Sequence, residues 1–453
     1  MSVLLAGIAL VAIPSSAFSQ AQATSGVVRG TVLDNDGRAI AGATVTVRNV
    51  ETNQSRDVTT NRQGAYVASL LRVGTYDVSV RFIGYQAARH EGVAVGLGGT
   101  ALENFRLTAS AVELEEITVV AANPEVDVSA VASKTSFSDQ AIEAIPNDGR
   151  NLQNLVVLTP NVAVVQGPDG DEISIAGQRG IHNNVMVDGA DFNNPFFGEQ
   201  RGGQRPAFTF NIDAIQEMVV IAQGDNAEFG RSSGGFVNIV TKSGGNKMRG
   251  TAHYFGQGSG LSSNFPTQGS FLGFEPDFFR HQFGFTLGGP IKKDKAFYFV
   301  AFDVQRRTET KQKNRLNLID PALVAWTDTT FGGALAGDFG SIRRKDDNIA
   351  LLAKVDWSMG EKHFASLKYN FSDANQPNGT NDSDFWGLSS NGVELVQSNA
   401  INGSLTSLLS NTVSNEFRFQ LSREDRPRPY DHAINPNTSR PFPDTDIGFL
   451  ASD

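Results

Sequence analysis

The second half of the chain alternates between apolar and polar residues over stretches of about ten residues. In one stretch Phe283 and Leu287 share one face of an extended strand, while Gln282 and Thr286 share the other. The same alternation recurs in four further stretches, at residues 296–307, 348–357, 363–371 and 416–422. Long strands with one apolar and one polar face are typical of transmembrane β-barrels. We therefore expect residues 245–453 to form the first strands of an antiparallel barrel.

A soluble β-sandwich is the alternative, because its strands alternate in the same way. Its strands are usually shorter, at about 5–6 residues. The connections also differ, since residues 292–295 form a short turn and residues 311–346 a long polar excursion. Short turns and long loops at opposite ends are characteristic of outer-membrane barrels, so we favour the barrel. The strands number about seven, too few to close a barrel in lipid, and we expect the chain to be the amino-terminal part of a longer protein.

Residues 26–108 have a different texture, with short strands separated by glycine-containing turns. Residues 28–32 and 43–47 alternate as strands, and Gly37 in the turn after the first can adopt a positive φ. Short strands at this spacing predict a β-sandwich of prealbumin or immunoglobulin type.

The connecting part, residues 126–244, mixes short helices with strands. A helix is expected to begin after Ser138 and to end at Pro146. Residues 184–188 form a strand that ends in an Asp-Gly turn, and residues 236–242 form the last strand. This pattern predicts an α+β domain, so the chain as a whole is expected to be mainly β.

Residues 113–123 stand between these domains and contain a run of β-forming residues from Ile117 to Val120. No partner strand is evident nearby, and Pro124 discourages further pairing. A loose strand of this kind can add to the edge of another protein's sheet through its main chain. The alternative is an interdomain linker that is merely rich in β-forming residues.

The composition narrows the choice of function. The chain has 453 residues, a net charge of −10 and no cysteine. The acidic balance argues against nucleic-acid binding, and the absence of cysteine excludes disulfides and thiolate metal sites. Residues 1–22 contain an apolar run, residues 3–13, followed by small residues, which predicts a signal peptide, although no Lys or Arg precedes the apolar core. A buried amino-terminal helix is the alternative.

Three resemblances account for this organisation. Residues 26–108 resemble the carboxypeptidase regulatory-like domain, on Gly30, Val32, Asp34, Asp36, Gly37, Gly42, Ala43, Val45, Val47, Gly64, Tyr66, Leu71, Gly74, Tyr76, Val78, Val80, Gly84 and Tyr85. Residues 126–244 resemble the plug domain of TonB-dependent outer-membrane receptors, on Ile145-Pro146, Leu155–Thr159, Ala176–Gly180, Val185–Gly189 and Gly234–Lys242. The order of domains is similar to that of the Oar-like receptors.

The resemblance implies roles for particular residues. The strand ahead of the plug matches the TonB box, with Glu115, Glu116, Ile117, Thr118, Val119 and Val120. Two polar residues of the plug are candidates for seating it in the barrel, Arg179 and Asp188, although a role inside the plug is equally open. A loop of aromatic and arginine residues is the candidate ligand site, with Phe196, Phe197, Arg201, Arg205 and Phe208. Contact with the barrel wall is the alternative for this loop.

The function that follows is uptake of an unidentified extracellular ligand, without enzymatic activity or a cofactor. The expected partners are TonB, with ExbB and ExbD acting indirectly, and the lipid of the outer membrane, with the amino-terminal domain in the periplasm. The alternative is a surface adhesion or protein-secretion component. Signal transduction is a weaker third reading. Whether the sandwich binds sugar, peptide or nothing stays open.

Signs of other chemistry are weak. Gly230–Gly234 matches G-x-S-x-G, but a strand-forming run follows where the hydrolase motif needs a helix. Asp34 and Asp36 begin a sequence like a calcium loop, but Val45 stands where that loop needs a bidentate Glu. The six histidines are scattered, without the spacing of a metal site. We therefore expect no catalytic residue and no metal.

Overall fold

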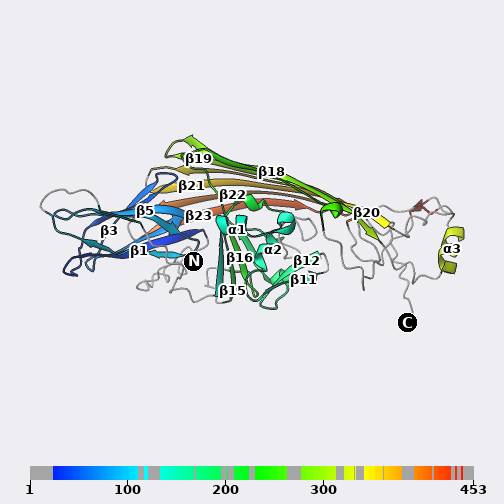
Figure 1. The fold of residues 1–453 in the computed structure, drawn as a ribbon, viewed down its shortest axis with the longest axis horizontal. Coiled ribbons are helices and arrows are strands. Elements are labelled where there is room, and N and C mark those ends of the chain that lie inside the picture. Colours follow the sequence, from blue (N-terminus) through cyan, green and yellow to red (C-terminus); the bar gives the residue numbers. More distant parts are fainter. Residues whose placement is uncertain are drawn as a thin grey trace, which may run out of the picture.

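The computed structural model (Figure 1) describes residues 24–110, 117–120, 133–167, 170–194, 201, 209–223, 230–262, 277–312, 321–330, 332, 341–360, 362–379, 392–410, 413–429, 434–435 and 440–441. Three parts follow one another along the chain: a sandwich (residues 24–110), a plug (residues 133–241) and a wall of long strands (residues 249–425). In Figure 1 the wall runs along the length of the molecule, with the plug under its middle and the sandwich at one end. The predicted fold class is confirmed.

The sandwich consists of two sheets that enclose an apolar core. One sheet has the order β4-β1-β7, with β8 also paired to β1, and the other has the order β3-β2-β5-β6-β9. The strands of the sandwich are β1 (Ser25–Asp34), β2 (Thr44–Asn49), β3 (Ser55–Thr59), β4 (Ala65–Arg72), β5 (Gly74–Arg81), β6 (Ala88–Val95), β7 (Thr100–Leu102) and β8 (Phe105–Leu107). Alternate residues such as Val45, Val47, Val78 and Val80 are buried between the sheets, as the period of two along each strand requires.

The strand β9 (Ile117–Val120) does not stand alone. It pairs in parallel with β6, where Ala88 lies opposite Ile117 and Glu91 lies opposite Val120. The expectation that this segment lacks a nearby partner strand was wrong. The reason is physical: β6 would otherwise be an open sheet edge, and open edges accept extended chains from any part of the sequence.

The plug is an α+β domain around one five-stranded sheet, of order β10-β15-β16-β13-β14. Its strands are β10 (Ser133–Ser138), β11 (Val162–Gly167), β12 (Gly170–Ile175), β13 (Asn184–Val187), β14 (Ala190–Asp191), β15 (Ile215–Gln223) and β16 (Phe236–Thr241). Its helices are α1 (Asp139–Ala144) and α2 (Leu152–Val156), with short 3-10 turns at Asp148–Arg150, Gly180–His182 and Ile212–Ala214. Ser138 caps α1, as expected, by accepting a hydrogen bond from the Ala141 amide.

The wall is a single antiparallel sheet of order β17-β18-β19-β20-β21-β22-β23. Its strands are β17 (Arg249–Gly258), β18 (Phe278–Lys292), β19 (Ala296–Gln312), β20 (Ser341–Ser358), β21 (His363–Pro377), β22 (Val393–Leu408) and β23 (Ser414–Asp425). The remaining elements are η4 (Ser259–Leu261), α3 (Pro321–Thr330), β24 (Ile434–Asn435) and β25 (Arg440–Pro441). Most strands are longer than the predicted ten residues, because β19 and β20 continue their ladder into the segment expected to be a loop.

The two faces of the wall differ as the alternation predicts. On β18, Phe283 and Phe285 are about half exposed on the outer face, whereas Gln282 is buried on the inner one. The inner face packs against the plug, and Phe299 and Leu352 of the wall belong to the same apolar core as the plug's own side chains. No helix among the described residues is long and apolar enough to cross a membrane.

The sandwich is joined to the plug by the loop around Leu97. The Leu97 side chain is 2% exposed and packs with apolar residues of the plug, among them Val219, Phe236 and Val240. Its amide donates a hydrogen bond to Glu217, and its carbonyl accepts one from Lys134. Gly96 permits this approach, since a Cβ there would lie 3.3 Å from the Glu217 carboxylate. The joint therefore combines apolar burial with charge-assisted hydrogen bonds.

Replacing Leu97 with Ala is expected to weaken this joint by about 2 kcal/mol, the lower end for a buried Leu→Ala change. Hydrogen exchange of the residue 97 amide, which is protected by Glu217, should then rise by roughly 30-fold. Leu102→Ala is the matched control, because Leu102 is 56% exposed on β7. Equal exchange in both variants would contradict the described joint.

Candidate functional site

Among the carboxylates that the plug presents to the wall, Asp188 contacts two lysines of the wall. Asp188 occupies the tight turn between β13 and β14, with φ of 52°, and its amide donates to the Ile239 carbonyl. Its side chain accepts hydrogen bonds from the amide and the hydroxyl of Thr241, at 2.8 and 2.7 Å. The Asp-Gly turn predicted from sequence thus aims a fixed carboxylate out of the end of the plug sheet.

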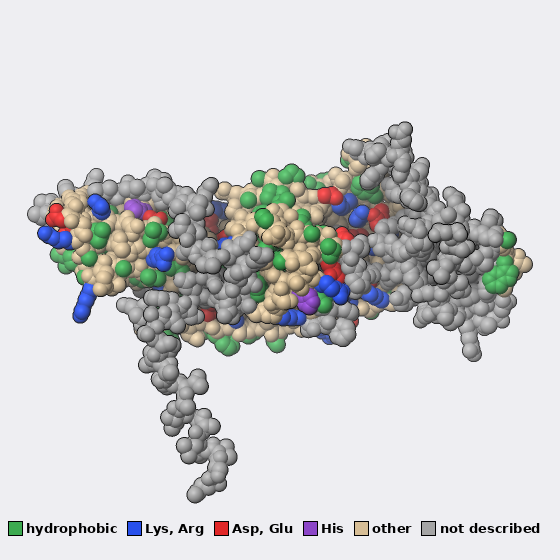
Figure 2. All heavy atoms as spheres, turned by 90° about the horizontal axis from the view of Figure 1, so that it is seen from below, with side chains coloured by type: hydrophobic (Ala, Val, Ile, Leu, Met, Phe, Trp, Pro, Cys, Tyr) green, Lys and Arg blue, Asp and Glu red, His purple; other side chains and the backbone are tan. Residues whose placement is uncertain are grey.

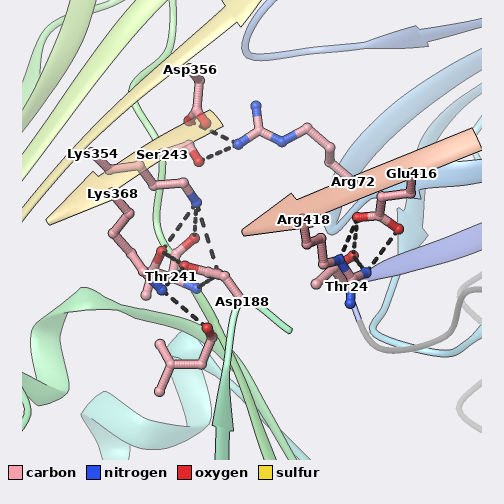
Figure 3. A network of polar contacts seen from close by, with 11 residues as sticks. Thr24, Arg72, Asp188, Thr241, Ser243, Lys354, Asp356, Lys368, Glu416 and Arg418 are labelled. Atoms are coloured by element: carbon pink, nitrogen blue, oxygen red, sulfur yellow. Dashed lines mark hydrogen bonds and ion pairs between the residues drawn. The ribbon is translucent and has the colours of Figure 1, made fainter. Parts of the chain in front are cut away.

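Two lysines of the wall meet this carboxylate (Figure 3). The Lys368 ammonium donates to Asp188 at 2.6 Å and to the Val187 carbonyl at 3.1 Å. The Lys354 ammonium lies 3.9 Å from Asp188 and donates to the carbonyl and hydroxyl of Thr241. Both lysine side chains are almost fully buried, at 6% exposure or less. The plug therefore supplies the counter-charge and the acceptors that two buried cations need.

The environment of Asp188 determines its charge. Burial alone would raise the pKa of the Asp188 carboxyl, but the ammonium groups of Lys354 and Lys368 and the hydrogen bond from Thr241 outweigh burial and hold that pKa well below its usual range. Asp188 is therefore ionised at neutral pH. The contact is a buried ion pair with satisfied hydrogen bonds, the kind whose disruption leaves an uncompensated charge.

A second polar contact joins plug and wall at β17 and β19. Arg150 and Asp213 of the plug form an ion pair at 2.5 Å. On the wall side, the His253 ring lies 2.8 Å from Asp213 and 3.5 Å from Asp303. The Arg150 guanidinium also lies over the Phe255 ring, 5.1 Å from its centre. Burial would raise the pKa of Asp213, but the neighbouring His253 and Arg150 lower that pKa to about 2.

A third contact fixes the sandwich to the wall. Arg72 at the end of β4 donates to the buried carboxylate of Asp356 on β20 at 2.9 Å. The same guanidinium bonds Ser243 and lies over the ring of Phe364, 4.4 Å from its centre. Figure 3 shows this contact beside the Asp188 cluster. A cavity of about 160 Å³ lies next to this contact and is lined by residues of the sandwich, the plug and the wall.

The predicted site residues differ in their exposure and in their contacts with the wall. Asp188 contacts the wall, whereas Arg179 is exposed and forms no ion pair with any residue that the structure describes. Arg201 is 5% exposed and donates to the Asp191 carbonyl, so it is buried rather than open to solvent. Three predicted features lie wholly or partly outside the described residues. They are the signal peptide (residues 1–22), the acidic start of the TonB-binding segment (Glu115 and Glu116) and most of the ligand loop (Phe196, Phe197, Arg205 and Phe208).

Several residues of these contacts were not singled out from the sequence. Lys354 and Lys368 stand on the polar side of the predicted alternation, which is the only signal that could have marked them. Arg72, Arg150 and Asp213 carry no local signal, because their partners lie far away in the chain. In general, a charged residue on the inner face of a wall strand predicts a buried partner on whatever fills the interior.

Comparisons with known proteins agree with these three parts. The carboxypeptidase regulatory-like domain model matches residues 27–108, the TonB-dependent receptor plug domain model matches residues 127–237, and an outer membrane beta barrel domain model matches residues 240–322. The TonB-dependent transporter Oar of Myxococcus xanthus is 27% identical over 373 residues, covering 79% of this chain. The chain spans about a third of the length of that relative, 34%.

Solved structures with a similar arrangement include the outer-membrane transporter YddB of Escherichia coli, at a TM-score of 0.49 and 14% identity, covering 67% of this chain and 41% of that one. The siderophore receptor PirA of Acinetobacter baumannii has a TM-score of 0.48 and 15% identity, covering 68% and 42%.

Models of a regulatory-like domain, a TonB-dependent receptor plug domain and an outer membrane beta barrel domain thus match consecutive parts of the chain. The chain is similar to the transporter Oar, and its regulatory-like domain lies ahead of the plug, as the sequence analysis predicted.

Replacing Lys368 with Met is expected to weaken the attachment of the plug by about 3 kcal/mol, because it leaves the Asp188 carboxylate buried without its closest cation. Cleavage of the plug by protease in a urea series measures the change. Lys362→Met is the control, since Lys362 is exposed near the start of the same strand. A urea midpoint as high for Lys368→Met as for the control would contradict the assignment.

The attachment of the plug to the wall is also expected to weaken as the pH falls. A carboxyl whose pKa is lowered on folding contributes stability above its unfolded pKa, and this is lost as pH falls through the folded value. For Asp213 the loss should therefore occur between about pH 4, the unfolded value, and pH 2, its folded value. The urea midpoint measured down this pH range should fall less in Asp213→Asn than in the unchanged chain.

Proposed function

We propose that the chain forms the energised part of an outer-membrane uptake receptor, with residues 115–120 as the strand that TonB binds and the plug as the gate. The observation that carries this is the combination of a short extended strand with a plug that is held to the wall by buried ion pairs. The similarity to the transporter Oar supports the same reading.

The ion pairs explain why a gate of this kind needs external energy. Moving the plug away from β20 and β21 separates Asp188 from Lys368 and Lys354, and removes the acceptors that Thr241 and Val187 give these two cations. Breaking such a contact typically costs several kcal/mol. The outer membrane has no nucleotide supply, so the work would come from the inner membrane through TonB, with ExbB and ExbD behind it.

The strand suits a pull delivered through the main chain. A partner that pairs with β9 would hold it by backbone hydrogen bonds, which are insensitive to side-chain identity. Force on β9 would pass along the chain to β10, the edge strand of the plug sheet, which is paired with β15. The sandwich would lie in the periplasm, on the side where the short turn of residues 293–295 meets it through Asn53 and Asp294.

The ligand would enter from the opposite end, toward residues 193–209. Arg201 in this segment is buried beside Phe192, and its guanidinium interacts electrostatically with the carboxylates of Glu424 and Asp191. We propose that Arg201 anchors the loop, and that Phe196, Phe197, Arg205 and Phe208 supply the contacts to an organic or anionic ligand.

The test of the proposed function is binding of a peptide of residues 113–123 to the purified periplasmic domain of TonB from the same organism. Val119→Pro removes a main-chain donor from the strand and should lower affinity at least tenfold, with Val119→Thr as the β-forming control. Calorimetry measures both. The same substitution in the intact receptor should abolish uptake, whereas an adhesin would tolerate it. A peptide that does not bind even at millimolar concentration would overturn the TonB assignment.

A further inference from the structure

The strand assigned to TonB is already paired within the chain. All four residues of β9 lie opposite residues of β6, in the register Ala88–Ile117 to Glu91–Val120. The other side of β6 is paired with β5, so β9 covers the edge of the sandwich sheet. A main-chain group of β9 that bonds β6 is not available to a second partner strand.

The ladder between the two strands is short for a structural reason. Gly92, the residue after the last paired position, has a φ of 76°, which is in the left-handed region. The β5–β6 register also shifts between Tyr76 and Val78, opposite this point. A bulge of this kind bends a strand and ends regular pairing. Among the described residues, the pairing with β9 spans four residues and ends at Glu91, beside this bulge, and a ladder of this length is short enough to exchange.

The side chains of β6 are bound to the sandwich itself. Arg89 forms ion pairs with Asp77 at 2.6 Å and with Glu91 at 3.1 Å. The His90 ring lies 2.6 Å from the Glu103 carboxylate and stacks on Phe105. These contacts hold β6 in place, and the contact that the structure describes between β6 and β9 is through the main chain. That is also the mode by which a partner protein would recognise β9.

The sandwich that carries β6 is itself fixed. The Leu97 joint attaches it to the plug, and the Arg72–Asp356 ion pair attaches it to the wall. A strand paired with β6 is therefore held at a fixed place beside the plug, at a high effective concentration. A partner strand that uses the same edge of β9 must compete with this intramolecular pairing.

We propose that β6 of the sandwich is the resting partner of the TonB-binding strand, so that TonB must displace β6 before it can pull. This inference rests on the proposed function, because it takes β9 as the strand that TonB binds. The regulatory-like domain then sets the affinity for TonB: a change that loosens β6 from β9 exposes the strand, and a change that tightens the pairing hides it.

The absence of cysteine from the chain allows a direct test. Ala88→Cys with Ile117→Cys places two thiols at directly opposed positions, where neighbouring strands lie within the span of a disulfide. The matched control is Ala88→Cys with Val120→Cys, whose second thiol is displaced by three residues, about 10 Å along the strand. Each full chain is oxidised, half of it is reduced again, and binding to the periplasmic domain of TonB is measured for both forms.

The opposed pair should form an intrachain disulfide in good yield, and its oxidised form should bind TonB at least tenfold more weakly than its reduced form. The displaced pair should form little disulfide and bind equally under both conditions. Failure of the opposed pair to oxidise would overturn the inference, because β9 would then not rest on β6. Equal binding by its oxidised and reduced forms would also overturn it, since TonB would then add to β9 without displacing β6.

The same experiment separates this inference from the proposed function. The unmodified peptide of residues 113–123 binds TonB if the strand is a TonB box, whatever the state of β6. If the peptide binds TonB and the oxidised and reduced chains bind it equally well, only the inference that β6 is the resting partner of β9 is overturned. Absence of peptide binding overturns the TonB assignment, and the inference falls with it.

Discussion

The carboxylate of Asp188, which is partly buried and lies between two buried lysines, is the contact on which the arrangement of plug and wall depends. Lys354 and Lys368 are directly opposite each other on β20 and β21, and like charges in such a pair repel. Both ammonium groups are buried, so water cannot solvate their charges. The turn at Asp188 places one negative charge between them. The Thr241 carbonyl and hydroxyl accept hydrogen bonds from Lys354, and the Val187 carbonyl accepts one from Lys368. The wall strands are therefore adapted to a filled interior.

The other contacts extend the same principle along the molecule. Arg150 and Asp213 of the plug meet His253 and Asp303 of the wall, and Arg72 of the sandwich meets Asp356. Each is a charge on an inward-facing strand position that is matched by a charge from another domain. Contacts of this type are specific and costly to break one at a time, which suits a gate that stays closed until work is done on it.

Much of the fold follows from the sequence because strand alternation is local. The exposed Phe283 and the buried Gln282 occupy the faces that the pattern assigns to them. Asp188 was a candidate for seating the plug because of the resemblance to plug domains, and its Asp-Gly turn has a local sequence signal. Arg179 has no comparable contact with the described residues, since a polar residue in a glycine-rich turn is as well placed in solvent.

The pairing of β9 with β6 could not be predicted in this way. It joins segments separated by the whole of β7 and β8, and a main-chain ladder leaves no mark in side-chain pattern. The lengths of β19 and β20 were missed for a related reason, because polar residues such as Lys345 and Arg343 continue a ladder as well as apolar ones do. Strand pairing between distant segments is thus what the structure adds to the sequence, and it changes the function proposed for β9.

Hydrogen exchange of the intact chain with and without the periplasmic domain of TonB tests the account most directly, because it observes the strand and the plug in one experiment. The account predicts that TonB removes protection from the amides of Ala88–Glu91 that face β9. The amide of Thr241, which is bound to Asp188, should keep its protection, since no force is applied. Unchanged protection of β6 with TonB bound, or loss of protection at Thr241 instead, would contradict the account.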